Sequence, residues 1–385
     1  MAKAIRTKVE ESVHEMFHSE EGLRKIVESV VQVALNTEIE GHLQARRYER
    51  TDSRRGYRNG YKRRRLKTRV GELDLKLPQS RDTNFQTQLF GRYQRYEGAL
   101  LTTIAEMYVQ GVSTRRVATI MEKLGGFEIS ATTVSKVAQQ LDEQLEQLRS
   151  RRLDNIAFPY LVIDARYEKV RVNGHVVSQT VLVTAGINSA GEREILDWRV
   201  ANSESEATWD DVFLTLVMRG LRGLQVVISD AHSGIQAALR RRFQGVSWQR
   251  CRVHFIRELL KCVQWKEFAH VAKDLKKLMK VESAETARQI ASEIATKWAD
   301  RFPQLSQRLE AGIDDCFPSL PVVPQHHHRL VSTNMIERIM RTLKQRTRVI
   351  GIFPSRESCH RICGAVLWEI HEDWRLESPY LRMSD

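Results

Sequence analysis

The sequence predicts an α/β fold in which helices flank a mixed five-stranded sheet. Three apolar segments separated by short polar turns come first, and two more alternate with helical segments; they cover residues 156–164, 175–189, 193–201, 224–229 and 246–251. Strands in succession, followed by strands that alternate with helices, are typical of a mixed sheet with helices packed on it. The chain has 385 residues, of which 42% are hydrophobic and 28% charged, so two or more globular domains are expected.

Composition also indicates the compartment. Five cysteines, an odd number without a regular framework, fit a reducing environment better than a secreted one. The start, residues 1–17, mixes charged with apolar residues, and no apolar run is long enough for a membrane span. We therefore expect a cytoplasmic protein with no membrane partner.

The amino-terminal part predicts helices, then a basic tract, then a strand. Val27, Val31 and Leu35 repeat at helical spacing within residues 5–46, and residues 70–80 alternate apolar with polar residues as a short strand or hairpin arm does. The formal net charge of +13 favours a polyanionic partner, because cations that neutralise phosphates release condensed counterions.

Much of that charge lies in the basic tract, residues 46–69, which contains twelve Lys or Arg against two acids, with three tyrosines between them. Such a tract can follow a phosphate backbone and stack rings on bases, although a solvated basic loop is the simpler alternative. The candidate DNA-binding residues here are Arg54, Arg55, Arg58, Lys62, Arg63, Arg64, Arg65 and Lys67.

Residues 97–151 return to a helical pattern that contains a possible helix-turn-helix. Ser113 or Thr114 can cap a helix that ends at the glycines 125–126, and the segment 130–133 can cap a second helix near 133–140. In a helix-turn-helix the second helix enters the major groove, which makes Thr133 and Lys136 candidate DNA contacts. An ordinary helical hairpin has the same pattern, so both interpretations stay open.

Two predicted strands lead directly into an aspartate. Asp164 follows one apolar run, and Asp230 follows another that precedes a helix. The carboxyl ends of strands in an open sheet are where functional sites assemble, so both aspartates are candidates. Asp230 could instead cap the following helix.

A third acid is predicted on a helix near the carboxyl terminus. Four residues form an apolar stripe expected to face the sheet, namely Ile336, Ile339, Met340 and Leu343. Glu337 lies at its edge, followed on the same side by the candidate DNA-binding cations Arg341, Lys344 and Arg348. An exposed Glu–Arg pair one turn apart is the simpler alternative.

Three converging carboxylates would repel one another unless cations lay between them. Hard oxygen ligands select Mg²⁺ or Mn²⁺, and two such ions about 4 Å apart can activate an attacking oxygen and stabilise a leaving oxygen in phosphoryl transfer. A basic chain with such a site predicts chemistry on nucleic acid.

With these features the chain resembles the mutator-type transposases of bacterial insertion sequences. The resemblance rests on GYRNGY with the following basic run, LVIDARYEKVR, VVISDAHSGI, WQRCRVHF and ERIMRTLKQRTRVIGIFPS, in this order. It implies a ribonuclease-H-like fold with Asp164, Asp230 and Glu337 as a DDE triad, and a helical insertion at 255–325. Two departures lie near the glutamate: the family more often has proline after the asparagine matching Asn334, and another asparagine where Met340 stands.

The family also carries a Cys-x2-His pair, matched here by Cys251 and His254. These two residues are half of a tetrahedral zinc site, for which Cys262, His270 or the run 326–328 would have to supply the other ligands. A buried thiol and a hydrogen-bonded histidine that support the sheet are the alternative, which the incomplete ligand set favours.

The resulting hypothesis is a bacterial, nucleoid-associated DNA transposase that binds terminal inverted repeats and performs metal-dependent strand cleavage and strand transfer on target DNA. Because two ends must be joined, a homodimer or larger assembly is expected. The alternatives are a repeat-binding protein without catalysis and a metal-dependent nuclease without strand transfer. The expected regions are a basic DNA-binding part, a helix-turn-helix-like domain, the first part of the catalytic core, the insertion and the last helices of the core, at 1–90, 91–152, 153–254, 255–325 and 326–385.

Overall fold

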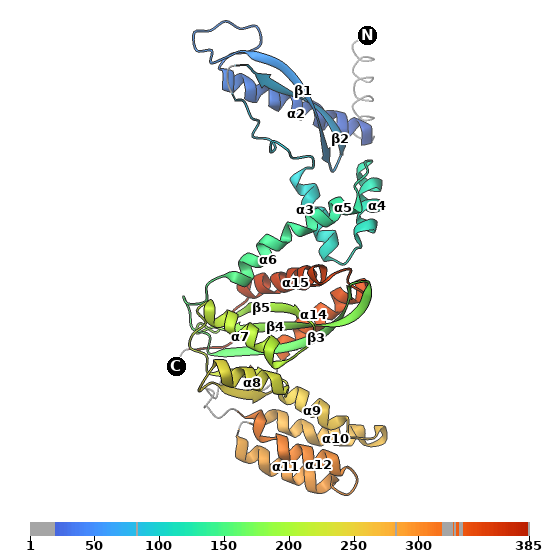
Figure 1. Cartoon of the computed structure of the whole chain (residues 1–385), viewed down its shortest axis with the longest axis vertical. Coiled ribbons are helices and arrows are strands. Elements are labelled where there is room, and N and C mark those ends of the chain that lie inside the picture. Colours follow the sequence, from blue (N-terminus) through green and yellow to red (C-terminus); the bar gives the residue numbers. More distant parts are fainter. Residues whose placement is uncertain are drawn as a thin grey trace, which may run out of the picture. The chain divides into compact units, whose positions relative to one another are not determined.

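The computed structural model describes residues 20–81, 84–281, 283–317, 326, 329–330 and 334–383. The chain divides into two compact units between Gln140 and Leu141 (Figure 1). Within the described residues, no helix is both long enough and apolar enough to cross a membrane.

The first unit begins with a helix packed on a two-stranded antiparallel ribbon. Helix α2 (Glu20–Leu43) packs against strand β2 (Gly71–Ser80), which pairs with strand β1 (Arg58–Thr68). The small core between them includes Leu35, Leu73 and Leu75, all at most 1% exposed. The short strand or hairpin arm expected at residues 70–80 is β2, an arm of this ribbon. The other strand, β1, lies within the basic tract. Of its residues, only Leu66 and Thr68 are fully buried.

Three short helices complete this unit, namely α3 (Gly98–Val109), α4 (Thr114–Gly125) and α5 (Ala131–Gln139). The Ser113 hydroxyl caps α4 by accepting a hydrogen bond from the Arg116 amide, and the Ser130 hydroxyl caps α5 by accepting one from the Thr133 amide. Gly126 ends α4 in the left-handed region, at φ +63°. The expected layout of two capped helices joined by a glycine turn is therefore present.

The second unit contains the five-stranded mixed sheet that the sequence predicted. Its strands are β3 (Tyr160–Val172), β4 (His175–Ile187), β5 (Arg193–Ala201), β6 (Val226–Ser229) and β7 (Ser247–Arg250), in the order β5-β4-β3-β6-β7. The first three strands are antiparallel, whereas β6 and β7 run parallel to β3.

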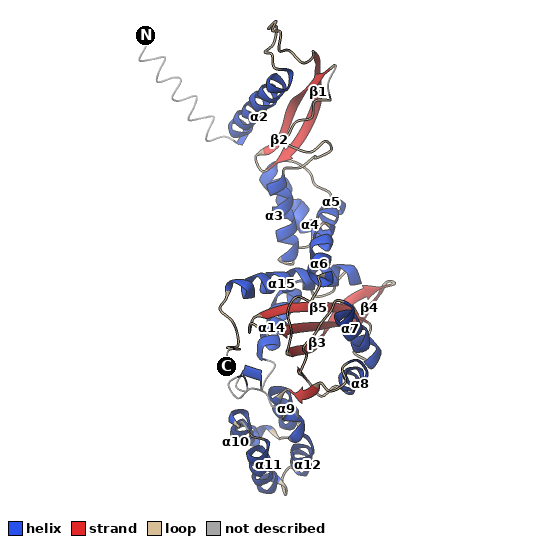
Figure 2. Cartoon of the chain, turned by 90° about the vertical axis from the view of Figure 1, so that its left-hand side faces the viewer, coloured by secondary structure: helices blue, strands red, loops and turns tan. Residues whose placement is uncertain are grey.

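Helices cover both faces of this sheet (Figure 2). Helices α7 (Glu206–Met218) and α8 (Ser233–Arg242) bury one face in a core built around Leu161, Ile163, Trp209 and Phe213. Helices α14 (Asn334–Ile350) and α15 (Arg356–Leu376) pack against the sheet from other parts of the chain. Helix α6 (Leu141–Ser150) packs on α15 and β5 and so lies in this unit, whereas the helix-turn-helix-like domain was expected to extend to residue 152.

A separate helical core lies between β7 and α14 in the sequence. Its helices are α9 (Arg252–Leu260), α10 (Phe268–Leu275), α11 (Ala284–Trp298) and α12 (Pro303–Gly312), with 3-10 turns at Trp265–Glu267, Lys276–Lys280 and Asp314–Cys316. Leu259, Leu275, Trp298 and Leu309 are among the side chains buried in it. The described part of the expected insertion is helical throughout apart from its connecting turns, and its first helix begins at Arg252, next to the sheet.

Arg252 links separate turns of this helical core through hydrogen bonds. Its side chain is 2% exposed. The guanidinium donates hydrogen bonds to the carbonyls of Val281 (2.5 Å), Leu278 (3.3 Å) and Cys316 (3.5 Å), and it lies over the Phe317 ring. One buried cation therefore satisfies backbone groups from two separate turns of the insertion.

We predict that Arg252→Met lowers the free energy of unfolding by roughly 3 kcal/mol or more, because buried carbonyls lose their donors while the apolar volume is retained. Urea titration measures this change. Arg288→Met is the matched control, since Arg288 is 58% exposed and pairs with Asp314 at the surface of the same helices. Equal losses in the two variants would contradict the structural role of Arg252.

Candidate active site

Asp164 and Asp230 occupy equivalent positions on neighbouring parallel strands. Strand β6 pairs with β3 at Tyr160–Val162 only, with Val162 opposite Ile228. Asp164 follows Val162 by two residues, and Asp230 follows Ile228 by two residues. The expectation that Asp164 ends its strand is wrong: β3 continues to Val172, because its antiparallel partner β4 pairs along its full length. Asp164 lies instead where the parallel neighbour of β3 stops.

Burial and negative charge act on Asp164. Its carboxylate accepts a hydrogen bond from the Ala165 amide at 2.9 Å. The side chain keeps some exposed surface, yet burial raises the pKa of Asp164 to about 7, with smaller upward contributions from the charges of Asp230 and Glu204 and an opposing one from His254. Asp230 is therefore close enough for its charge to act on Asp164.

One carboxylate oxygen of Asp230 makes no hydrogen bond with the described residues. This oxygen, Oδ1, is buried. The alternative role as a helix cap is wrong, because α8 is capped by His232, whose Nδ1 accepts a hydrogen bond from the Gly234 amide at 3.2 Å. A buried carboxylate oxygen without a donor is costly unless a ligand compensates it.

Cys251 and His254 lie at the start of α9, beside the end of β6. The Cys251 amide donates to the Ser229 carbonyl at 2.7 Å, which places the start of the helix next to Asp230. The pKa of His254 is raised to about 9, first by a hydrogen bond with the Cys251 thiol and further by the charges of Asp164 and Glu337, against the effect of burial. The carboxylates of Asp164 and Glu337 therefore both favour the charged form of His254.

Glu337 has the position on α14 that the apolar stripe predicted. Ile336, Ile339 and Leu343 are at most 1% exposed, while Met340 is only partly buried. The Glu337 side chain is 14% exposed and binds Arg257 of α9 through two hydrogen bonds, Nη1 to Oε1 at 2.6 Å and Nη2 to Oε2 at 3.2 Å. The next cation is His254 Nε2, at 3.7 Å from Oε1. Both ion pairs of Glu337 are therefore with α9.

The structure brings the two aspartates together but does not bring Glu337 to them. The cations next to Glu337 are His254 and Arg257, both on α9, and His254 also faces Asp164. In the described part of the chain, no group of three or more His, Cys, Asp or Glu side chains is spaced to hold a metal ion. The same finding applies to zinc at Cys251 and His254.

Of the other candidate zinc ligands, Cys262 is a free, half-buried thiol, and His270 and His326 are engaged elsewhere. His270 faces Glu267 at 3.6 Å. His326 is hydrogen-bonded to the Tyr160 hydroxyl at 3.1 Å and to the Arg382 carbonyl at 2.8 Å. Residues 327–328 lie outside the described residues. Cys251 and His254 therefore act on the site through charge and hydrogen bonding in this structure.

Sequence reasoning missed one acid of the site. Glu204 lies in the loop before α7 with its side chain 8% exposed, 3.9 Å from His232 Nδ1, and accepts a hydrogen bond from the Trp209 indole at 3.1 Å. Burial raises its pKa, and the charge of Asp230 adds to this. Close packing holds the loop there, because a Cβ at Gly234 would lie 2.6 Å from the Glu206 amide nitrogen. No local pattern distinguishes Glu204 from other acids before a helix.

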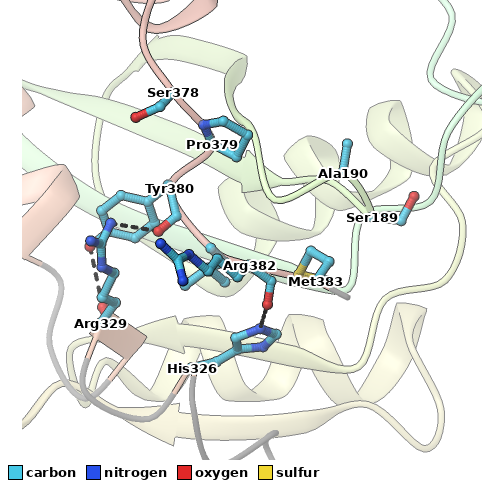
Figure 3. A pocket seen from close by; sticks show the side chains of 10 residues that line it. Ser189, Ala190, His326, Arg329, Ser378, Pro379, Tyr380, Arg382 and Met383 are labelled. Atoms are coloured by element: carbon cyan, nitrogen blue, oxygen red, sulfur yellow. Dashed lines mark hydrogen bonds between the residues drawn. The ribbon is translucent and has the colours of Figure 1, made fainter. Parts of the chain in front are cut away.

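A cavity of about 870 Å³ lies elsewhere in this unit (Figure 3). The carboxyl-terminal segment closes it: Arg329 donates to the Tyr380 carbonyl at 2.5 Å, and His326 bonds the Arg382 carbonyl. Its lining contains none of the predicted site residues.

The predicted DNA-binding cations divide into two groups. Arg54, Arg58, Arg64 and Lys67 make hydrogen bonds within the first unit. Those that remain exposed are Arg55, Lys62, Arg63, Arg65 and Lys136 in that unit, and Arg341, Lys344 and Arg348 on α14. Thr133 is half-buried, and its hydroxyl lies 2.9 Å from that of Ser130.

Comparisons with known proteins agree with the resemblance. The family model described as "Transposase, Mutator family" matches residues 2–377. The transposase for insertion sequence element ISRM5 of Rhizobium meliloti is 42% identical over 365 residues, which cover 95% of this chain and 92% of that protein.

Two further relatives are similar along most of their length. The transposase for insertion sequence element IS256 in transposon Tn4001 of Staphylococcus aureus is 38% identical, over 91% of this chain and 90% of that protein. The transposase for insertion sequence element IS406 of Burkholderia multivorans is 37% identical, over 94% of both chains. Because the family model and these relatives span nearly the whole sequence, the chain belongs to the mutator family of transposases.

Proposed function

We propose that this chain is a DNA transposase that binds the terminal inverted repeats of an insertion sequence and cuts and joins DNA strands with Asp164, Asp230 and Glu337. The observation that carries the proposal is the pair of aspartates at equivalent positions on adjacent parallel strands, one of them with a buried, unpaired oxygen. The relatives support it, since they are named as transposases for insertion sequence elements.

The aspartate pair fits a divalent cation, whereas Glu337 in its present arrangement does not. Asp164 and Asp230 supply hard oxygen donors whose proximity is unfavourable without a cation. Glu337 is occupied by Arg257. When bound by these three carboxylates, two Mg²⁺ or Mn²⁺ ions would activate the attacking oxygen and stabilise the leaving oxygen.

The chain's own cations then have defined tasks. His254 offsets the charge of Asp164 and Glu337 while the carboxylates are near one another. Arg257 must release Glu337 before the glutamate can join the aspartates; its side chain is 57% exposed, so solvent or a DNA phosphate can take over the guanidinium. The site is thus preorganised at the aspartates and adjustable at the glutamate.

DNA is the partner in this proposal, both as terminal repeats and as target. The exposed cations Arg341, Lys344 and Arg348 continue along α14 from Glu337, where they can hold the phosphates of a strand that reaches the site. Two element ends must be held for joining, so the proposed active form is a homodimer or a larger assembly on DNA.

We predict that Asp164→Asn abolishes cutting of a labelled duplex that ends in the element's own inverted repeat, by at least about 100-fold in rate with Mg²⁺. Binding to the repeat, measured by gel shift, should be unchanged. The same assay with the wild-type protein separates the alternatives: binding alone indicates a repeat-binding protein, cutting alone a nuclease, and cutting with joining a transposase. A variant that still cuts would remove Asp164 from the reaction.

The raised pKa of Asp164 predicts a pH-dependent stability cost. The carboxyl pKa is about 7 in the folded state against 3.8 as the ordinary value, so the folded protein binds the proton more tightly and loses stability as pH rises between these values. Without divalent metal, the free energy of unfolding of Asp164→Asn relative to the wild type should therefore increase by about 3 kcal/mol as the pH rises from 5 to 8. Urea titrations in chelator test this, and a gap that does not change with pH would contradict it.

For the third acid, we predict that Glu337→Gln also reduces cutting by at least about 100-fold while repeat binding persists, because the amide keeps size and helix propensity but loses the charge. Glu357→Gln and Glu369→Gln are controls. Glu369 pairs with Arg346 at 3.0 Å, and Glu357 lies in the first turn of α15. Normal cutting by Glu337→Gln together with failure of a control would show that the third acid is elsewhere.

A further inference from the structure

The β1–β2 ribbon has one covered face and one open face. Side chains alternate across an antiparallel pair, so Leu66 and Leu75 point toward α2 and are buried. On the opposite face, which we call the outer face, lie the exposed residues Tyr61, Arg63, Arg65 and Lys76, with Asp74 directly opposite Arg65. Arg65 pairs with Glu72 at 3.4 Å, so Arg63 and Lys76 are the cations of this face considered below.

Arg63 and Lys76 form a like-charge pair across the ribbon. The two residues are directly opposite in the strand register. Both are exposed, and neither makes an ion pair with any residue that the structure describes. Like charges directly opposite destabilise an antiparallel pair, so this arrangement costs stability in the free protein and becomes favourable when a polyanion lies on it.

Other cations of the basic tract hold the ribbon in place. The Arg64 guanidinium donates to the carbonyls of Gly91, Arg92 and Gln94 at 2.6–2.8 Å and lies over the Phe90 ring. Lys67 Nζ donates to the Glu128 carbonyl at 2.7 Å. These two residues therefore fix neighbouring segments, while the outer face stays available.

We propose that the outer face of the β1–β2 ribbon enters the major groove of duplex DNA, with Arg63 and Lys76 reaching guanine edges and Tyr61 beside them. This inference rests on the proposed function for its DNA partner. A two-stranded ribbon fits the width of the major groove, and Arg or Lys can donate to guanine O6 and N7 there. The exposed cations Arg47 and Arg50 precede the ribbon, where they reach the flanking phosphates.

The test uses the full-length protein, a duplex carrying the element's inverted repeat, and the double variant Arg63→Ala, Lys76→Ala. The Kd for the duplex should rise at least about 30-fold, and the thermal midpoint should not fall, because the variant removes a like-charge pair. Guanine N7 methylation should interfere with wild-type binding, and this interference should disappear at specific guanines in the variant.

Two controls match the change. Arg288→Ala with Arg301→Ala removes the same charge from exposed positions of the helical insertion, 58% and 59% exposed, and should leave the Kd within about twofold. Arg64→Ala should lower the thermal midpoint, because three carbonyls lose their donor. A change of all three arginines 63–65 would mix these two effects.

An unchanged Kd, or weaker binding with an unchanged interference pattern, would overturn groove entry by the ribbon. Loss of the same guanine contacts in Lys136→Ala instead would assign the groove to α5. If the ribbon fails but Asp164→Asn binds the repeat without cutting it, the transposase proposal stands. If the wild-type protein does not bind the repeat at all, the proposed function fails with it.

Discussion

The parallel pairing between β3 and β6 is the constraint on which the candidate site depends. It extends over only three residues of β3, from Tyr160 to Val162, and so sets the relative height of Asp164 and Asp230 at the edge of the sheet. The pairing of β7 with β6 then brings Cys251 and the start of α9 to the same edge. A shift of one residue in either register would turn the aspartates to different faces.

Around these aspartates the structure balances charge instead of avoiding it. The charge of Asp230 acts on both Asp164 and Glu204, while His254 faces Asp164 and Glu337 and His232 lies beside Glu204. Glu337 is held by Arg257, whose side chain is 57% exposed, so the glutamate lies in an exchangeable ion pair. Each contact in this balance comes from a different element, which makes the site sensitive to how α9 and α14 sit on the sheet.

Local signals were sufficient for much of the fold. The serine caps of α4 and α5 and the buried stripe on α14 follow from neighbouring residues, and the five strands follow from apolar runs bounded by turns. Strand β1 was not predicted, because arginines on both faces obscure its alternation. The extension of β3 to Val172 was missed as well, because it depends on pairing with β4 and not on the apolar content of β3 itself.

The candidate site was predictable only in part for the same reason. Each aspartate directly follows an apolar strand segment, and that signal is visible in the sequence. The partners of Glu337 are not: Arg257 is 80 residues away along the chain and is brought near by α9. Glu204 is positioned by the close approach of Gly234 in α8 to the start of α7, a packing contact between two helix ends that no periodicity reveals.

The unequal lengths of β3 and β6 have another consequence, for self-association. Beyond the end of β6, β3 would present a bare edge of amide and carbonyl groups, which is a template for pairing with other chains. The segment after α14 covers part of it: the Phe353 amide donates to the Lys169 carbonyl, and the Phe353 carbonyl accepts from the Arg171 amide. The charged side chains of Arg166 and Lys169 lie along the same stretch. A chain truncated before Phe353 would lose this cover and expose the backbone edge of β3. The carboxyl-terminal segment therefore also shields β3 from pairing with other chains.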